Sequence, residues 1–346
     1  MTGANGLRSP PEHLCEPSCN IFVFPRREAA AASPTGRLAV DFLDLVGNTP
    51  LVELVHCSPK PGIRLFAKLE GQNPTGSIKD RVVASLLREA QASGLLRAGQ
   101  EIVEATTGNT GIALAMMGRR LGHPVRLVVP DTIAREIVPA LEMFGATIQW
   151  VHGDVGIKRA VDVARQIARD EGAFLLNQFG SPSNVRCHYE TTGAEIVADC
   201  PEVDVLVCGL GTGGTIMGAG RRLREHNPQV RLVAAEPHPG EHLQGLRNLL
   251  DGFVPSILDM DFFDAKILVR NTSALRAVQE VLTREGVFGG PSSGAVTHAA
   301  LKFAERLDHA TMVLVFADAG WKYLSSLSPA APQRRTESEL DDVLWW

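Results

Sequence analysis

The sequence predicts an α/β protein in which helices cover both faces of mostly parallel, doubly wound sheets. Two observations predict this class. Nearly continuous apolar runs of about four to eight residues, such as VRLVVP (125–130), have the composition of buried parallel strands. Between these runs, segments such as 157–172 carry apolar residues at helical spacing, and several of them end at Gly or Asn. Strands and helices that alternate in this way predict βαβ units.

Each expected element follows from one of these two patterns. The expected strands, in chain order, are EIVEA (101–105), VRLVVP (125–130), ATIQWVH (146–152), AFLLNQ (173–178), VDVLVCG (203–209), VRLVAAE (230–236) and MVLVFAD (312–318). The expected helices are a long one that starts at Lys79, and then 111–122, 135–145, 157–172, 214–227 and 275–286. With 346 residues, the chain is long enough for about two domains.

The composition is that of an ordinary globular enzyme or binding protein. Apolar residues make up 45% of the chain and charged residues 21%, and the formal net charge is -5. This charge offers no basic surface, so we expect no nucleic-acid partner. The longest apolar runs are far shorter than a membrane span, so we expect no membrane partner either.

The cysteines and the two ends of the chain suggest a cytoplasmic protein with mobile tails. Six cysteines without a CxxC pair predict reduced thiols. No metal site is expected, because Cys15 and Cys19 lack a matching His or Cys pair. The N-terminus does not have the pattern of a secretory signal, and residues 1–38 are expected to form a mobile tail. Residues 328–346 begin equally polar but end in LWW, which we expect to dock against the protein.

The stretch NPTGSIKDR (73–81) places a lysine where a helix is expected to begin. A cation is disfavoured at this end of a helix, because the positive end of the helix dipole lies there. Two interpretations of Lys79 are therefore open. Either its ammonium is simply solvated, or it is driven towards the neutral, nucleophilic form.

A glycine-rich turn, GLGTGGT (209–215), follows an expected strand and opens an expected helix. Backbone amides at a helix N-terminus form a cradle suited to phosphate. The turn also satisfies GxGxxG, and Glu236 lies after the next strand, so a nicotinamide-dependent dehydrogenase is an alternative. The structural alternative is a tight turn without a ligand, although so many glycines are costly unless the backbone must approach something closely.

Two more turns precede expected helices. TTGNTG (106–111) offers hydroxyls and amides suited to a carboxylate, and Asn109 adds a donor for a phenolic oxygen. GGPSSGA (289–295) places Ser292 at a helix start. Taken alone, each turn is best interpreted as a helix cap. Together with Lys79 they predict a ligand site, since such turns gather at the carboxyl ends of the strands in doubly wound sheets.

Five ordered motifs resemble the pyridoxal-phosphate enzymes of the cysteine synthase and cystathionine β-synthase group. The resemblance spans roughly residues 43–327 and is carried by LVGNTPLVEL, KLEGQNPTGSIKDR, EATTGNTGIALA, GLGTGGTIMGAGRRLRE and GGPSSGA. It implies two doubly wound three-layer αβα domains of fold type II, the tryptophan synthase β-like fold. It also implies a homodimer that binds pyridoxal 5′-phosphate.

The resemblance further implies a role for each motif. Lys79 would form the Schiff base and act as the catalytic base, and Asn109 would meet the ring oxygen of the cofactor. Ser292 would face the pyridine nitrogen of the cofactor. A hydroxyl does not keep this nitrogen protonated, so the cofactor ring would be only a mild electron sink. The cofactor phosphate would lie in the loop made of Gly211, Thr212, Gly213, Gly214 and Thr215. The substrate carboxylate would bind to Thr106, Thr107, Gly108, Thr110 and Gln178.

Two further stretches resemble bacterial O-phosphoserine sulfhydrylases: GEHLQGLRNLLDGFVP (240–255) and FADAGWKYLS (316–325). This resemblance implies β-replacement on O-phospho-L-serine through an aminoacrylate to give L-cysteine. Arg247 would bind the substrate phosphate, because a guanidinium fork fits a phosphate better than an acetyl group. The sulfur donor would be sulfide or a small carrier protein with a C-terminal thiocarboxylate. The structural alternative for Arg247 is a surface loop arginine.

The same resemblance implies domain boundaries and a closing movement. Residues 39–50 and 73–181 would form a smaller domain that closes on the substrate, and residues 51–72 and 182–327 a larger one that holds the phosphate of the cofactor. The tail 328–346 would act as a lid. Thr107 and Pro291 replace the usual Ser and Ile, so O-acetylserine, or a non-sulfur nucleophile that gives another β-substituted alanine, stays open. A non-catalytic role, binding the C-terminus of another protein in the cleft, also stays open.

Overall fold

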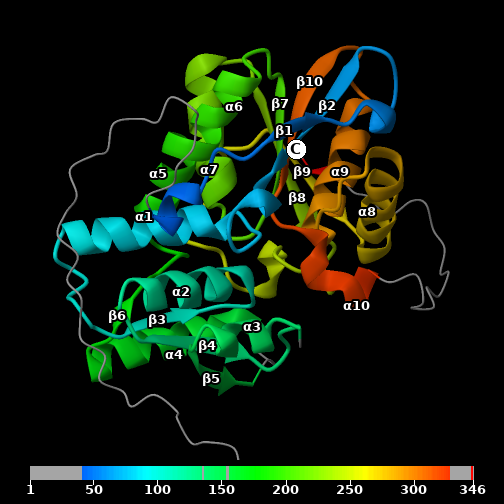
Figure 1. Cartoon of the computed structure of the whole chain (residues 1–346). Helices are drawn as coiled ribbons and strands as arrows, with labels where there is room; N and C mark the ends of the chain where they lie inside the picture. Colours follow the sequence, from blue (N-terminus) through cyan, green and yellow to red (C-terminus); the bar gives the residue numbers. More distant parts are fainter. Residues whose placement is uncertain (1–40, 135, 153–155, 328–343, 346) are drawn as a thin grey trace, which may run out of the picture. The chain divides into compact units, whose positions relative to one another are not determined.

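The described residues of this computed structural model are 41–134, 136–152, 156–327 and 344–345, and they form two β-sheets with helices around them (Figure 1). One sheet has seven strands in the order β1-β2-β10-β7-β8-β9-β11, and the other has four in the order β5-β4-β3-β6. The α/β fold with parallel sheets is therefore confirmed. Among these residues, every helix is too short or too polar to span a membrane.

The seven-stranded sheet is parallel in its centre and antiparallel at both edges. Its five inner strands, β2, β10, β7, β8 and β9, pair in parallel, and β1 and β11 pair antiparallel to their neighbours. All seven residues of β10 are buried, as expected for a strand covered on both faces. The strands are β1 (Leu51–Glu53), β2 (Ile63–Leu69), β7 (Val205–Gly209), β8 (Arg231–Pro237), β9 (Ala265–Val269), β10 (Ala310–Phe316) and β11 (Leu344–Trp345).

The four-stranded sheet is entirely parallel. Its central strand β3 is fully buried, whereas the edge strand β5 is partly exposed and Trp150 on it is 47% exposed. The strands are β3 (Ile102–Ala105), β4 (Val125–Pro130), β5 (Thr147–Val151) and β6 (Phe174–Leu175).

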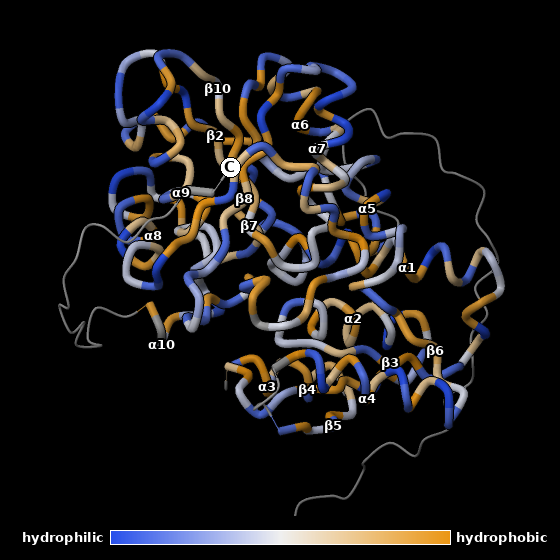
Figure 2. Tube along the Cα trace, turned by 180° about the vertical axis from the view of Figure 1, so that it is seen from behind, coloured by the Kyte–Doolittle hydropathy of each residue, from blue (hydrophilic) through white to orange (hydrophobic). Residues whose placement is uncertain are grey.

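Helices cover both faces of each sheet, and four apolar clusters lie between the layers. In the seven-stranded sheet, α8 and α9 lie on one side and α5, α6 and α7 on the other (Figure 1). Along the helices, hydrophilic and hydrophobic residues alternate, in keeping with one buried and one exposed face (Figure 2). The α-helices are α1 (Lys79–Ala92), α2 (Asn109–Arg120), α3 (Val138–Met143), α4 (Gly156–Glu171), α5 (Pro182–His188), α6 (Ala194–Asp199), α7 (Gly214–His226), α8 (Asn271–Glu285), α9 (Pro291–Ala304) and α10 (Leu324–Leu327).

The remaining helical turns are short. The 3-10 turns are η1 (Phe42–Leu45), η2 (Val55–Cys57), η3 (Glu70–Gln72), η6 (Leu249–Asp251) and η7 (Gly320–Tyr323), and η5 (Tyr189–Gly193) is a π-helix between α5 and α6. All seven expected strands and all six helices expected by their residue ranges have counterparts, and the helix expected after GGPSSGA is α9. The strands β1, β2, β9 and β11 were not expected, and β6 is shorter than the expected run 173–178.

Of the expected tails, residues 1–38 and 328–343 lie outside the described residues, as do Cys15, Cys19 and Trp346. The backbone of Leu344–Trp345 pairs antiparallel with β9 at the edge of the seven-stranded sheet. The lid expected for this tail stays a prediction.

Candidate active site

The turn that carries Lys79 is fixed to the end of β10. The N–H of Ile78 donates to the carbonyl oxygen of Ala317 at 2.8 Å, and the N–H of Ala319 donates to that of Gly76 at 3.2 Å. Gly76 has φ +79, a left-handed conformation that suits glycine. Lys79 is the first residue of α1, as the sequence predicts.

The environment of Lys79 favours its neutral form. The pKa of Lys79 is lowered from 10.5 to about 8, chiefly by desolvation and then by the positive charge of Arg247, while Asp318 opposes the shift. Lys79 is partly exposed, and its side chain lines a cavity. The lowered pKa agrees with the nucleophilic interpretation of Lys79, whose role stays a prediction.

The sequence-predicted turns gather around Lys79 at the carboxyl ends of strands. TTGNTG follows β3, GLGTGGT follows β7, and GGPSSGA pairs through Gly289 with the segment after β10. Two adjoining cavities are both lined by Lys79, Asn109, Gly211 and Thr212. All the candidate site residues except Gly214 line at least one of these cavities. The carboxyl ends of the strands are where ligands bind in doubly wound folds, and here strands of both sheets contribute.

The first cavity is lined by the glycine-rich loop and by Ser292. Ser292 is the second residue of α9 and is 3% exposed. Its hydroxyl has no hydrogen-bond partner among the described residues. A buried polar atom without a partner is costly, so this hydroxyl is suited to a ligand that completes its hydrogen bonding. In the loop itself, Gly213 has φ +84. A Cβ at Gly214, which packs outside the cavity, would lie 2.1 Å from Oδ1 of Asn184.

Behind the glycine-rich loop lies a buried histidine that the sequence analysis did not identify. The Nε2 atom of His188 lies 3.4 Å from Oγ1 of Thr215, and its Nδ1 lies 3.0 Å from Oγ1 of Thr192 in the π-helix. The pKa of His188 is well below its usual value, first because of burial and then because of the positive charges of Lys79 and Arg81. A neutral imidazole thus supports the loop from behind.

The second cavity is lined by the TTGNTG turn, Gln178 and Arg247. The hydroxyl of Thr110 donates to Oε1 of Gln178 at 2.7 Å, and the N–H groups of Gly108 and Gly111 donate to Oγ1 of Thr106. These bonds fix a set of hydroxyls and amides at the N-terminus of α2. Such a set is suited to a carboxylate.

The loop that carries Gln178 is itself held by a buried acid that the sequence analysis missed. Glu104, on β3, accepts a hydrogen bond of 2.6 Å from the N–H of Asn177, a residue with φ +59. Burial raises the pKa of Glu104 to about 8, against the opposing hydrogen bonds from Asn177 and Gln178. The side chain therefore orders the loop while carrying a proton at neutral pH.

Arg247 lies in an aromatic corner of this second cavity. Its guanidinium carbon is 4.8 Å from the ring centre of Phe179 and 5.9 Å from that of Phe253, and the two rings meet edge to face at 5.3 Å. Its backbone N–H donates to the carbonyl oxygen of Leu210. These contacts orient the guanidinium, and Arg247 lines the same cavity as Lys79.

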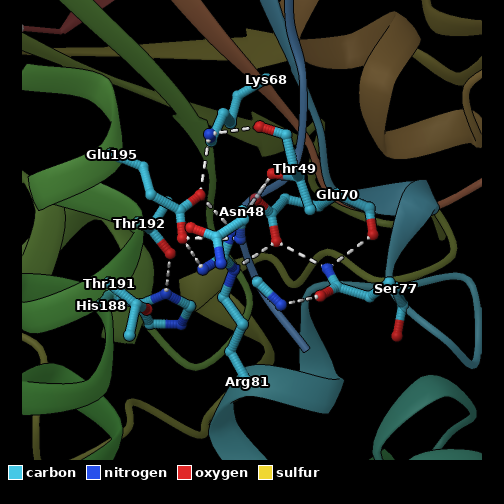
Figure 3. A network of polar contacts seen from close by, with 12 residues as sticks. Asn48, Thr49, Lys68, Glu70, Ser77, Arg81, His188, Thr191, Thr192 and Glu195 are labelled. Atoms are coloured by element: carbon cyan, nitrogen blue, oxygen red, sulfur yellow. Dashed lines mark hydrogen bonds and ion pairs between the residues drawn. The ribbon is translucent and has the colours of Figure 1, made fainter. Parts of the chain in front are cut away.

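A buried network of charges anchors the start of α1 (Figure 3). Arg81 donates to Glu70 at 2.7 Å and to Glu195 at 2.6 Å, and Lys68 pairs with Glu195 at 2.8 Å. The side chains of Arg81, Glu70 and Lys68 are at most 1% exposed. The partners come from distant segments, so the sequence pattern gives no sign of this network. Within the part of the chain that the structure describes, no three His, Cys, Asp or Glu side chains form a potential metal site.

Comparison with known proteins gives one family. The chain matches the model of pyridoxal-phosphate dependent enzymes over residues 42–318. It is 35% identical to the cysteine synthase of Aquifex aeolicus over 320 residues, which cover 89% of this chain and 97% of that protein. It is 36% identical to cysteine synthase B of Escherichia coli over 282 residues, or 81% of this chain and 93% of that one.

The chain is also similar to solved structures of related enzymes. The crystal structure of O-ureido-L-serine synthase is similar with a TM-score of 0.81 and 34% identity, covering 88% of this chain and 98% of that one. The cysteine synthase of Entamoeba histolytica is similar with a TM-score of 0.79 and 33% identity, covering 90% of this chain and 96% of that one.

Proposed function

Because this chain belongs to the family of pyridoxal-phosphate dependent enzymes, we propose that the two cavities around Lys79 are its cofactor and substrate sites. The first cavity fits the cofactor. Its glycine-rich loop at the N-terminus of α7 is suited to the phosphate, and the buried hydroxyl of Ser292 is free to meet the pyridine nitrogen. Lys79 would hold the cofactor covalently, and Asn109 would donate to its ring oxygen.

The chain is an enzyme of the cysteine synthase type, and we propose that it replaces the β-substituent of O-phospho-L-serine to make L-cysteine. The observation that carries the choice of substrate is that Arg247 and Lys79 line one cavity. A guanidinium already oriented by Phe179 can bind a phosphate through two parallel hydrogen bonds.

The other residues have roles that follow from their positions. Thr106, Thr107, Gly108, Thr110 and Gln178 bind the substrate carboxylate. Pyridoxal phosphate held by these residues would supply the electron sink for the negative charge that forms when the α-proton leaves. The substrate amine would first replace Lys79 on the cofactor, and the freed amine of Lys79, whose pKa is lowered to about 8, would take that proton.

Closure of a smaller domain, residues 39–50 and 73–181, on the larger one, residues 51–72 and 182–327, would exclude water from the site. We further propose a homodimer, and sulfide or a thiocarboxylated carrier protein as the sulfur donor. The tail 328–346 is proposed to assist closure.

The second candidate is another β-substituted alanine. It is supported by the similarity to O-ureido-L-serine synthase, whose product carries an oxygen substituent on the β-carbon. Identifying the product formed with sulfide and with an oxygen nucleophile separates the two candidates.

The experiment for the substrate compares kcat/KM for O-phosphoserine and O-acetylserine in the wild type and in Arg247→Ala. Losing charge-assisted hydrogen bonds to phosphate should lower kcat/KM for O-phosphoserine by roughly 10- to 100-fold. Arg247→Ala also removes a charge that lowers the pKa of Lys79, which affects both substrates alike. The readout is therefore the ratio of kcat/KM for O-phosphoserine to kcat/KM for O-acetylserine. The control is Arg120→Ala, which removes an exposed ion pair with Asp41 at the surface. An unchanged ratio would show that Arg247 does not bind the phosphate.

A further inference from the structure

The amide of Asn109 is held between two groups of opposite hydrogen-bonding type. The Nζ of Lys322 donates to Oδ1 of Asn109 at 2.6 Å. On the other side, Nδ2 of Asn109 donates to Oδ2 of Asp318 at 2.6 Å. An ammonium has donors and no acceptor, so only the amide oxygen can face Lys322. Lys322 and Asp318 together therefore fix the orientation of this amide.

Lys322 is itself held in place from several sides. It belongs to the turn η7, which follows β10, and its stem passes the NPTGSIKDR turn: a Cβ at Gly76 would lie 3.2 Å from Cε of Lys322. Burial lowers the pKa of Lys322, while the carboxyl groups of Asp318 and Asp80 oppose this shift. The Nζ of Lys322 is thus placed beside Asn109, and the two carboxyl groups favour its charged form.

Asp318 completes the arrangement. It is 2% exposed and also accepts a hydrogen bond from the hydroxyl of Tyr323. Burial raises the pKa of Asp318, whereas the hydrogen bonds from Tyr323 and Asn109 and the charge of Lys322 act in the opposite direction. The hydroxyl of Tyr323 is 3.4 Å from Nδ2 of Asn109, a much longer contact than the one to Asp318. The short bond uses one hydrogen of Nδ2. The second makes only the long contact to Tyr323, which a ligand oxygen in the cavity can replace.

We propose that Lys322 is a positioning residue that makes Asn109 present only N–H to the ring oxygen of the cofactor. The inference rests on the proposed function, because it needs Asn109 to face that oxygen. An amide that can only donate stabilises the ionised form of the ring oxygen, and the nearby ammonium polarises the amide further. Without Lys322, the amide loses the donor that binds its oxygen, and only the bond to Asp318 opposes a rotation that would turn this oxygen towards an ionised partner and repel it.

A simpler role for Lys322 would be to neutralise Asp318 and Asp80. That role predicts a loss of stability when Lys322 is replaced, but no effect that depends on Asn109. The two roles therefore differ in a double-mutant comparison of Lys322 and Asn109.

The test uses the visible absorbance band of bound pyridoxal phosphate, which reports the ionisation of its ring oxygen, together with the affinity for the cofactor. Lys322→Met should lower the ratio of the visible to the near-ultraviolet band about tenfold, as expected for a lost charge-assisted hydrogen bond. Lys322→Arg should restore most of the ratio. The control Lys302→Met, at a surface lysine of α9, should match the wild type.

The decisive comparison is made in an Asn109→Ala background, where Lys322→Met should cause no further change. An unchanged band in Lys322→Met, or an equal change with and without Asn109, would overturn the inference. If Lys322→Met does not fold, Lys322→Gln carries the same comparison, since its amide no longer forces one orientation on Asn109. A wild-type protein that binds no pyridoxal phosphate would instead refute the proposed cofactor site, so the two failures are distinguishable.

Discussion

Replacing Arg81 by methionine tests the network in Figure 3. The guanidinium of Arg81 donates through Nε to Glu70 at 2.7 Å and through Nη1 to Glu195 at 2.6 Å, and its side chain is 1% exposed. In Arg81→Met, Glu70 keeps hydrogen bonds from Thr49 and Asn73 but loses its counter-charge in a fully buried position. Removing one partner of a buried ion pair costs about 3–5 kcal/mol of unfolding free energy.

The assay is urea unfolding of the cofactor-free protein at pH 7, followed by circular dichroism. The matched control is Arg186→Met, whose ion pair with Glu89 is about half exposed and should contribute no more than about 1 kcal/mol. Arg81→Lys should lower the unfolding free energy by an amount between the losses in Arg81→Met and Arg186→Met. An ammonium keeps the charge but cannot donate to both carboxylates as the guanidinium does. If Arg81→Met lowers the unfolding free energy no more than Arg186→Met does, then the network does not stabilise the start of α1. The comparison requires equal denaturant slopes.

Two pH profiles test the titratable groups of the site. The rate at which the cofactor-free protein takes up pyridoxal phosphate should rise with pH and level off above about pH 8, because the pKa of Lys79 is lowered to about 8 and the neutral amine is the nucleophile. In Arg247→Ala this pH profile should move to higher pH. Uptake rates that do not vary with pH would contradict the prediction. Burial raises the pKa of Glu104 from 4.5 to about 8, so between these values the folded protein holds a proton that the unfolded chain releases, and the unfolding free energy should fall as pH rises through this range. Glu104→Gln should remove that part of the decline in urea midpoints, and a profile identical to the wild type would show that Glu104 is not its source.

The sequence predicted the buried strands best, because burial on both faces leaves a continuous apolar run. β4 lies where VRLVVP predicts it, and β10 and β8 follow their apolar runs closely. The strand β2 was missed because Arg64 and Lys68 interrupt its pattern. Lys68 is nevertheless fully buried, satisfied by Glu195 and by the carbonyl oxygen of Thr49. Such compensation depends on tertiary contacts that a local pattern does not contain.

The shortened strand β6 has a similar cause. The run AFLLNQ is apolar enough for a longer strand, but pairing ends at Leu175. Asn177 then adopts φ +59 and donates to Glu104, which directs Gln178 to Thr110. A polar contact in the site thus overrides the local preference for a strand.

The sequence predicted those site residues that lie in turns with a recognisable local pattern. Lys79 and the glycine-rich turns have local signatures, since each opens a helix, and the fold brings them together at the carboxyl ends of the strands. Asp318, Lys322 and His188 have no such signature. They reach the site only because the segment after β10 and the π-helix pack against it. The one advance signal was the stretch FADAGWKYLS, which carried a resemblance but no assigned role.

The most direct test of the account is to saturate the protein with pyridoxal phosphate, reduce it with borohydride and map the modified peptide by mass spectrometry. The account predicts one pyridoxyl group per chain, on Lys79, and no covalent label in Lys79→Ala. A label on another lysine, such as Lys322, or the absence of any label in a protein saturated with pyridoxal phosphate, would contradict the central claim that Lys79 holds the cofactor.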